Sequence, residues 1–413
     1  MLMDDAMITK RLVYHIGGYD PATPERVHRR FVRELRHFEM TWSVKSAVSE
    51  PEIEADQIAW NIDTAGPNWR VHTGYRFVRW DDVMESFQRR PTWQRIPLGL
   101  LSFVEFIFAG ALWGYLRTNW RYALFFLYPF LLVAIFAAVS GMAGLWVARA
   151  IGSALLGAAA AFATFVLLIE VAARWTYLAH LFDLWIFSRD YIHGRIPALE
   201  RRLDRIAREL VDSASSADVD EILVLGHSFG AVLCVDLLGR ALKLAPTLGE
   251  RGPRVAFLSI GSSILKIGLH RGAVRLRADL THVAAAPGLF WGEYQAVTDV
   301  MNFYKSDPMS ALGLPVCGRP HVRVVRFRQM LSSAAYRRVR RNFYRVHNQF
   351  ISGNTRRTAY DYFMLVCGPV SAESQVRLPD GAGSAISESG ALSKTTSASD
   401  AGACNGSMHL ARP

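Results

Sequence analysis

The sequence predicts an α/β protein in which a mostly parallel sheet is flanked by helices and is interrupted by an inserted transmembrane helical hairpin. Short apolar runs rich in β-branched residues alternate with helical runs, a pattern typical of parallel sheets. Two long uncharged stretches stand near the middle of the chain. The 413 residues are 51% hydrophobic, which is ample for one large core and a membrane segment.

Residues 1–96 are expected to form the N-terminal part of the α/β domain. Residues 11–16 (RLVYHI) have the composition of a strand and end at Gly17 and Gly18. Residues 24–42 then carry an apolar stripe at helical spacing, formed by Val27, Phe31, Leu35 and Phe38. A strand, a Gly-Gly turn and an amphipathic helix are therefore predicted.

Residues 97–189 are expected to form a membrane insertion. Residues 122–148 and 151–169 contain no charged side chain. Because about 20 residues of helix cross a bilayer, each stretch can span one. If the segments on either side of the insertion build one site, they lie on one side of the membrane, so the number of crossings is even. Two crossings are the simplest choice.

The sequence around the spans also predicts interfacial segments and an orientation. Residues 96–116 and 175–187 carry acidic residues among many aromatic ones, which favours interfacial or domain-packing helices. Five arginines precede the first span and five follow the second, whereas the connection holds only Arg149. The positive-inside rule therefore predicts a cytoplasmic domain and a multi-pass protein with two spans.

Residues 190–370 are expected to complete the α/β domain. Residues 197–212 predict a helix with one apolar face. The predicted strands cover residues 222–225, 255–260, 289–297 and 322–327. Residues 371–413 are rich in Ser, Gly and Ala, and we expect a disordered tail there.

A serine stands between two glycines where the strand at 222–225 passes into a helical run. The stretch reads Gly-His-Ser-Phe-Gly, with Ser228 in the middle. A sharp strand-to-helix turn needs small flanking residues and exposes the serine hydroxyl in front of the helix N-terminus. That terminus supplies unpaired N–H groups for a developing oxyanion. A purely structural turn is the alternative.

The chain resembles the α/β-hydrolase superfamily. The resemblance depends on GHSFG after a strand, on HIGGYD at the end of an early strand, and on the order Ser, Asp, His. It implies a histidine base after the last strand, where His347 is the candidate, and an acid after the preceding strand. Asp299 is the preferred acid and Asp307, which precedes a proline, is the runner-up.

The same resemblance implies an oxyanion hole. One N–H comes from the residue after the serine, Phe229, and another from the loop after an early strand, at Gly17 or Gly18. The chain departs from the HGGG form of lipases, because Ile16 stands where a glycine would be.

The remaining composition bounds cofactors and partners. The formal net charge is +11, and the basic and aromatic run at residues 337–345 could contact RNA or phospholipid. In a chain that already sits in a bilayer, phospholipid is the simpler partner, and we expect no nucleic-acid partner. Four cysteines show no metal-binding spacing, so we expect reduced thiols, no metal and no cofactor.

These observations predict a membrane-anchored serine hydrolase that cleaves a carboxylic ester, with a lipid-like substrate suggested by the location. Two alternatives stay open. One is a non-catalytic scaffold that docks partners at the membrane. The other is a thioesterase or peptidase that uses the same three side chains.

Overall fold

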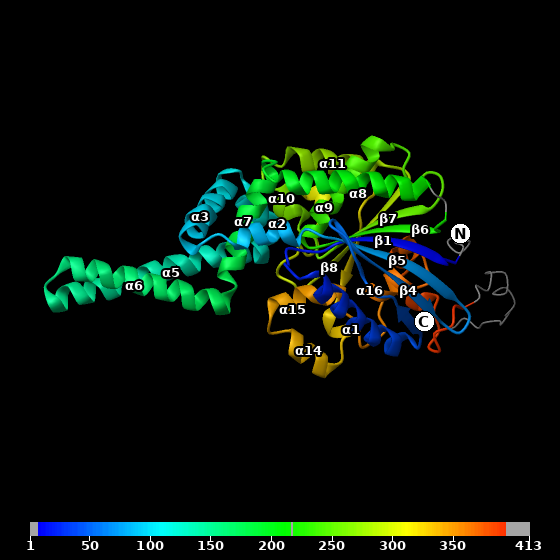
Figure 1. The fold of residues 1–413 in the computed structure, drawn as a ribbon, viewed down its shortest axis with the longest axis horizontal. Helices are drawn as coiled ribbons and strands as arrows, with labels where there is room; N and C mark the ends of the chain where they lie inside the picture. The colour runs from blue at the N-terminus through cyan, green and yellow to red at the C-terminus, as the bar shows by residue number, and fades with distance from the viewer. Residues whose placement is uncertain (1–6, 216–217, 394–413) are drawn as a thin grey trace, which may run out of the picture.

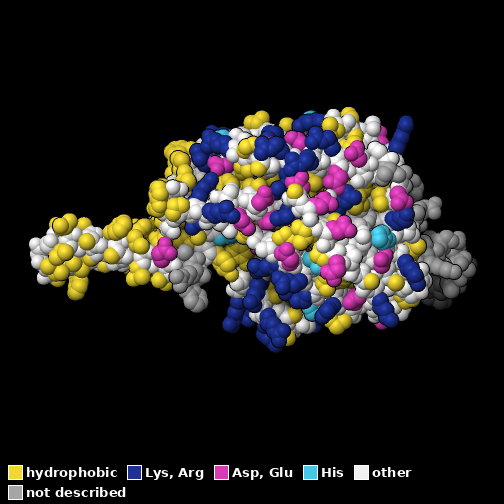
Figure 2. Space-filling model, viewed as in Figure 1, with side chains coloured by type: hydrophobic (Ala, Val, Ile, Leu, Met, Phe, Trp, Pro, Cys, Tyr) yellow, Lys and Arg dark blue, Asp and Glu magenta, His cyan; other side chains and the backbone are white. Residues whose placement is uncertain are grey.

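The computed structural model of the chain describes residues 7–215 and 218–393, with the side chains of residues 172–175 left aside. These residues form a domain centred on a sheet and a long helical stem that projects from one end of it (Figure 1). The stem is covered mostly by apolar side chains, whereas the surface of the domain mixes both signs of charge (Figure 2).

Among the described residues, nine strands form one sheet in the order β2-β4-β5-β1-β6-β7-β8-β9, with β3 paired to β4. Their bounds are β1 (Lys10–Ile16), β2 (Lys45–Val48), β3 (Glu52–Ile53), β4 (Gln57–Ala65), β5 (Arg70–Val78), β6 (Glu221–His227), β7 (Arg254–Ile260), β8 (Leu289–Ala296) and β9 (His321–Val325). The six strands from β5 to β9 along this order are parallel, and β4 runs antiparallel to β5, β2 and β3. The predicted mostly parallel α/β sheet is therefore confirmed.

Four of the parallel strands, β1, β6, β7 and β8, are buried on both faces, which explains their nearly continuous apolar sequences. Alternate residues of β1 enter different cores: Leu12 and Tyr14 join the core on one face, and Val13 joins the core on the other. The first core is covered by α2 (Asp81–Gln88), α7 (Leu178–Ile192), α8 (Pro197–Ser215), α9 (Phe229–Leu244), α10 (Ile264–Gly268), α11 (Val274–Ala285) and α12 (Pro308–Ala311). The second is covered by α1 (Pro24–Trp42), α13 (Phe327–Met330), α14 (Ser333–Val339), α15 (Phe343–Asn348), η1 (Gln349–Ile351), α16 (Tyr362–Cys367), α17 (Ala372–Arg377) and η2 (Gly381–Ser384).

The stem consists of α5 (Trp120–Ile151) and α6 (Ala154–Thr176), which are each long and apolar enough to cross a membrane. Small residues let the two helices approach closely, since a Cβ at Gly144 would lie 2.6 Å from the carbonyl oxygen of Gly157. These two helices match the predicted hairpin over residues 122–148 and 151–169 in length and apolarity.

Two further helices, α3 (Thr92–Phe108) and α4 (Ala111–Thr118), precede the stem and meet at 68°. Taken together they are also apolar enough to form one broken span. However, α4 is anchored to the domain, because Tyr115 is fully buried and its hydroxyl donates a hydrogen bond to the backbone carbonyl of Lys266 at 2.6 Å. This contact favours the predicted domain-packing role for residues 96–116.

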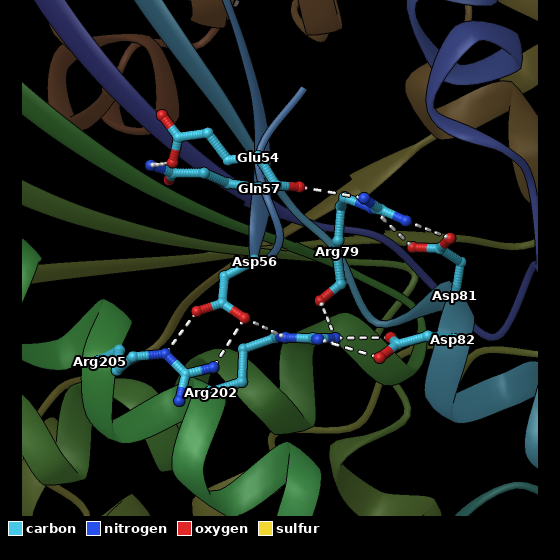
Figure 3. Close-up of polar contacts among 8 residues, drawn as sticks. All are labelled: Glu54, Asp56, Gln57, Arg79, Asp81, Asp82, Arg202 and Arg205. Atoms are coloured by element: carbon cyan, nitrogen blue, oxygen red, sulfur yellow. Dashed lines mark hydrogen bonds and ion pairs between the residues drawn. The ribbon is translucent and has the colours of Figure 1, made fainter. Parts of the chain in front are cut away.

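The segments before and after the insertion share one sheet. Strand β1 pairs with β5 from its own half and with β6 from the other half. A cluster of ion pairs also connects the segment before the insertion with the segment after it (Figure 3). There Arg202 of α8 donates hydrogen bonds to Asp56 at 2.9 Å and to Asp82 at 2.7 and 3.0 Å. Both ends of the stem therefore enter the same domain, as an even number of crossings requires.

The prediction of a disordered tail from residue 371 is wrong for residues 371–393. Ala372 and Val376 of α17 are buried in the second core, and Glu221 accepts a hydrogen bond from the Ala372 N–H at 2.8 Å. Further along, the backbone carbonyl of Gly390 accepts a hydrogen bond from Trp69 Nε1 at 2.8 Å. Few apolar residues suffice here because backbone groups supply the remaining contacts. Residues 394–413 lie outside the described residues.

Replacing Arg202 with Gln is expected to destabilise the protein by about 2 kcal/mol or more, because Asp56 and Asp82 then lose a largely buried cationic partner. Thermal unfolding of the purified protein in detergent measures this. Arg251→Gln, an exposed position on a loop, is the control. If Arg202→Gln and the control Arg251→Gln had equal melting temperatures, the structural role of the cluster would be contradicted.

The same cluster predicts a dependence of stability on acid. Arg205 and Arg202 lower the pKa of Asp56 to about 2, and Arg202 also lowers the pKa of Asp82. Carboxylates with depressed pKa values stabilise the fold above their unfolded pKa and lose that contribution as the pH falls through the folded pKa. The stability gap between wild type and Arg202→Gln should therefore shrink between about pH 5 and about pH 2. A gap that stays constant over that range would argue against these ion pairs.

Candidate active site

Ser228 occupies the turn between β6 and α9. Its backbone has φ 57° and ψ −122°, a conformation that residues other than glycine rarely adopt. Close packing around the turn explains the two glycines of the motif. A Cβ at Gly230 would lie 1.9 Å from the carbonyl oxygen of Ile16, and one at Gly226 would lie 2.4 Å from the Cα of Ala231. Such strain persists only where the surrounding structure enforces it, and it often marks functional sites.

Asp299 and His347 lie together at the carboxyl ends of the strands. Asp299 follows β8, and His347 lies in α15 after β9. His347 Nδ1 donates a hydrogen bond to Asp299 Oδ2 at 2.7 Å, and both residues are buried. The other carboxylate oxygen accepts a hydrogen bond from the Met301 N–H at 2.9 Å. These contacts fix the imidazole with its second nitrogen, Nε2, available as an acceptor.

Asp307, the runner-up acid, has a different position. Its side chain caps α12 by accepting a hydrogen bond from the Ser310 N–H at 2.7 Å. Glu293 lies within β8, where its carboxylate accepts hydrogen bonds from Ser259 Oγ and Gln295 Nε2. Asp299 is therefore the carboxylate that the structure brings to His347.

Ser228 and His347 line the same cavity, but their side chains are not hydrogen bonded to each other. Nε2 of His347 is buried and has no hydrogen-bond partner among the described residues. Ser228 likewise makes no side-chain capping bond to α9. In sites without a bound substrate, the contact between nucleophile and base is often long, and it tightens when the substrate binds.

His227, the variable residue of the motif, positions the imidazole of His347, a role that the sequence analysis did not assign. Its Nε2–H donates a hydrogen bond to the backbone carbonyl of His347 at 3.2 Å, and the two rings lie 4.6 Å apart. Burial holds the pKa of His227 well below its usual range, so the residue stays neutral. A neutral ring adds no charge that would repel a protonated His347.

Gly18 is the better placed of the two candidate oxyanion glycines. A Cβ at position 18 would lie 2.9 Å from Ser228 Cβ and 3.3 Å from Ser228 Oγ, so only glycine allows this approach. A Cβ at Gly17 would instead meet the ring of Phe77. Phe229 is the first residue of α9, where backbone N–H groups lack intrahelical partners. Both Phe229 and the Gly18 turn therefore flank the hydroxyl.

The cavity beside Ser228 is small, about 40 Å³, and polar groups without partners line it. Besides His347 Nε2, the hydroxyls of Tyr19 and Tyr344 are buried and unpartnered among the described residues. Burial raises the pKa of both tyrosines, so they remain neutral donors. A volume of this size holds water molecules rather than an acyl chain. A larger ligand therefore requires lining side chains to move.

The described residues contain no group of three or more His, Cys, Asp or Glu side chains arranged to hold a metal ion. Cys234 and Cys367 are buried free thiols, and Cys317 is an exposed one. Cys404 lies outside the described residues.

The backbone strain at Ser228 can be tested with two variants that both remove the hydroxyl. Ser228→Gly is expected to be more stable than Ser228→Ala by about 1 kcal/mol, because Gly adopts this φ and ψ without a Cβ clash. Thermal unfolding of both proteins in the same detergent measures the difference. An Ala variant at least as stable as the Gly variant would show that the turn is unstrained.

The structure thus places a serine on a strained turn, a buried imidazole–carboxylate pair and a glycine turn around one cavity. The three side chains come from positions far apart in the chain: Ser228 follows β6, Asp299 follows β8, and His347 lies in α15. No known protein family, curated protein or solved structure matches the chain.

Proposed function

We propose that the protein is a membrane-anchored serine hydrolase of the α/β-hydrolase type that cleaves a carboxylic ester. The observation that carries the proposal is the buried hydrogen bond between His347 and Asp299 at the cavity that Ser228 lines. A serine with only a structural role in the turn would require neither the His347–Asp299 hydrogen bond nor a backbone with positive φ.

In the proposed reaction, Ser228 Oγ attacks the ester carbonyl while His347 Nε2 takes its proton. Asp299 keeps the Nδ1–H oriented and stabilises the imidazolium that forms. The negative charge on the carbonyl oxygen is held by N–H groups of Phe229 and the Gly17–Gly18 turn. His347 then returns the proton to the leaving alkoxide, and an acyl-serine remains.

Water completes the cycle by the same steps. His347 takes a proton from a water molecule, the hydroxide attacks the acyl-serine carbonyl, and the proton goes to Ser228 Oγ as the carboxylic acid leaves. A thioester or amide could follow the same route, because the three side chains act on the acyl group and not on its leaving group.

A lipid-like ester is favoured by how the stem is connected to the site. Helix α7 follows the second apolar helix directly, and its residues His180 and Leu184 line the cavity beside Ser228. A substrate that leaves the bilayer near α6 therefore meets the site without a long transfer through water. The basic residues that flank the stem favour a cytoplasmic domain, which we include in the proposal.

A non-catalytic scaffold is the second candidate, favoured by the small cavity and by the missing hydrogen bond between Ser228 and His347. In that case, the imidazole–carboxylate pair would only stabilise the fold. Reactivity of the serine separates the two functions.

A fluorophosphonate probe should label the wild-type protein at Ser228, and Ser228→Ala should not react. Asp299→Asn should slow labelling by about 10³-fold, because the amide no longer favours the reactive tautomer of His347. Asp307→Asn is the matched control, since Asn also caps a helix and should leave labelling within about twofold. In-gel fluorescence over time measures all four proteins.

A wild-type protein that resists the probe, or a Ser228→Ala variant that labels equally, would favour the scaffold. Equal rates for Asp299→Asn and Asp307→Asn would remove Asp299 from the site. Folding of each variant is checked by its melting temperature.

A further inference from the structure

A basic groove of about 850 Å³ lies between α1 and the α14–α15 segment, and we call it the arginine groove. Five arginines line it: Arg26, Arg29, Arg30, Arg33 and Arg345. The four from α1 stand at positions 26, 29, 30 and 33, so each has another three or four residues away and together they form one stripe along that helix. Figure 2 shows Lys and Arg side chains gathered over α1 and α14. Among the residues that the structure describes, only the carboxylates of Asp20 and Glu34 line the groove with them.

Much of this positive charge has no partner within the described part of the chain. The guanidinium of Arg30 lies 3.5 Å from a carboxylate oxygen of Asp20, and that of Arg33 lies 2.9 Å from a carboxylate oxygen of Glu34. The other three arginines are exposed, and the structure pairs none of them with an acidic side chain among the described residues. Gln349, which also lines the groove, is buried and its Nε2 donor is unpartnered there. Arg29 and Arg345 donate only to backbone carbonyls, so exposed guanidiniums without an acidic partner lie beside a buried unpartnered donor, which fits an anionic ligand.

The arginine groove adjoins the cavity beside Ser228. Four residues line both: Asp20, Ala22, Arg30 and Asn348. The charge of the groove also reaches the site, since Arg30 adds to the effect of burial in lowering the pKa of His227. Once side chains that line the cavity move, one ligand could contact both the arginines and the serine hydroxyl.

The groove also lies near the membrane end of the domain. The ring of Phe343 in α15 is 5.4 Å from the ring of Tyr177, which directly follows α6. Asn342 Nδ2 donates a hydrogen bond to the Tyr177 hydroxyl at 3.3 Å. Since α6 is apolar enough to span, Tyr177 is close to the bilayer surface, where lipid phosphates are concentrated.

We propose that the arginine groove binds a phosphate group of the ester substrate, so that the enzyme hydrolyses phosphate-bearing acyl esters. This inference rests on the proposed function. A guanidinium matches two phosphate oxygens with two parallel hydrogen bonds, which favours phosphate over a neutral head group. The phosphate would sit among Arg26, Arg30 and Arg345, and the acyl carbonyl would reach Ser228 past Arg30.

The test compares esters that differ only in the phosphate. A long-chain monoacylglycerol and the corresponding acylglycerol phosphate are offered in micelles of an uncharged detergent, and a short-chain pair is offered in solution. For wild type, kcat/KM should be about tenfold or more higher for the phosphate ester, as expected for one or more charge-assisted hydrogen bonds. Preference in the micellar pair alone assigns the phosphate to a lipid, and preference in both pairs assigns it to phosphate esters in general.

Two variants of the groove locate the effect. Arg26→Gln and Arg345→Gln should each lower the preference for the phosphate ester several-fold, mainly by raising KM, and the double variant should remove most of it. Arg70→Gln is the matched control, because Arg70 is exposed and begins β5. It therefore lies at the amino ends of the parallel strands, whereas Ser228 lies at their carboxyl ends. This control should keep the wild-type preference.

The outcomes separate this inference from the proposed function. If the protein reacts with the fluorophosphonate but prefers the neutral ester of both pairs, the phosphate site is wrong and the hydrolase stands. If the preference survives in the double variant, the groove is not its source. If Ser228 does not react with the probe at all, the proposed function itself fails. Tight binding of an RNA oligonucleotide that the double variant loses, without any ester preference, would replace the phosphate ester with a nucleic acid.

Discussion

The parallel pairing of β1 with β6 is the constraint on which the rest of the structure depends. It places Ile16 opposite Gly226, so the turn after β1 reaches the turn that carries Ser228. The start of α9 then presses against the end of β1, which is why Gly230 cannot bear a side chain. Because β1 precedes the stem and β6 follows it, the same pairing also requires both ends of the stem to return to one side of a membrane.

The sequence predicts the central strands well because they are buried on both faces. Such strands appear as short, continuous apolar runs, as in β1, β6 and β7. Strands β4 and β5 were not predicted, since both alternate apolar and polar residues; they pair antiparallel with each other, and β5 is parallel to β1 on its other side. That alternation was the available signal. The sequence does not predict the ordered segment 371–393 for another reason. Composition reflects the content of apolar side chains, but not the hydrogen bonds of backbone groups that hold this segment against the domain.

The geometry of the candidate site was predictable to the extent that it follows the chain order. Parallel strands end at one edge of a sheet, so residues after β6, β8 and β9 meet there, and Ser228, Asp299 and His347 do so. Groups contributed by other segments were not predictable. The cavity also takes Tyr19 from the first turn and Tyr344 from α15, and no local pattern marks either. Their position depends on the packing of α1, α7 and α15 around the turn.

Electrostatics explain why His347, among the histidines that line the cavity, is suited to receive a proton. Burial lowers the pKa of His180 to about 4 and holds the pKa of His227 well below its usual range, and no described carboxylate is hydrogen bonded to either. His347 alone of the three has a carboxylate, that of Asp299, in direct contact. In the proposed reaction, this contact would stabilise the imidazolium that forms at His347. In the same proposed reaction, the positive charge of the adjoining arginine groove would favour the oxyanion that forms on the carbonyl oxygen of the substrate.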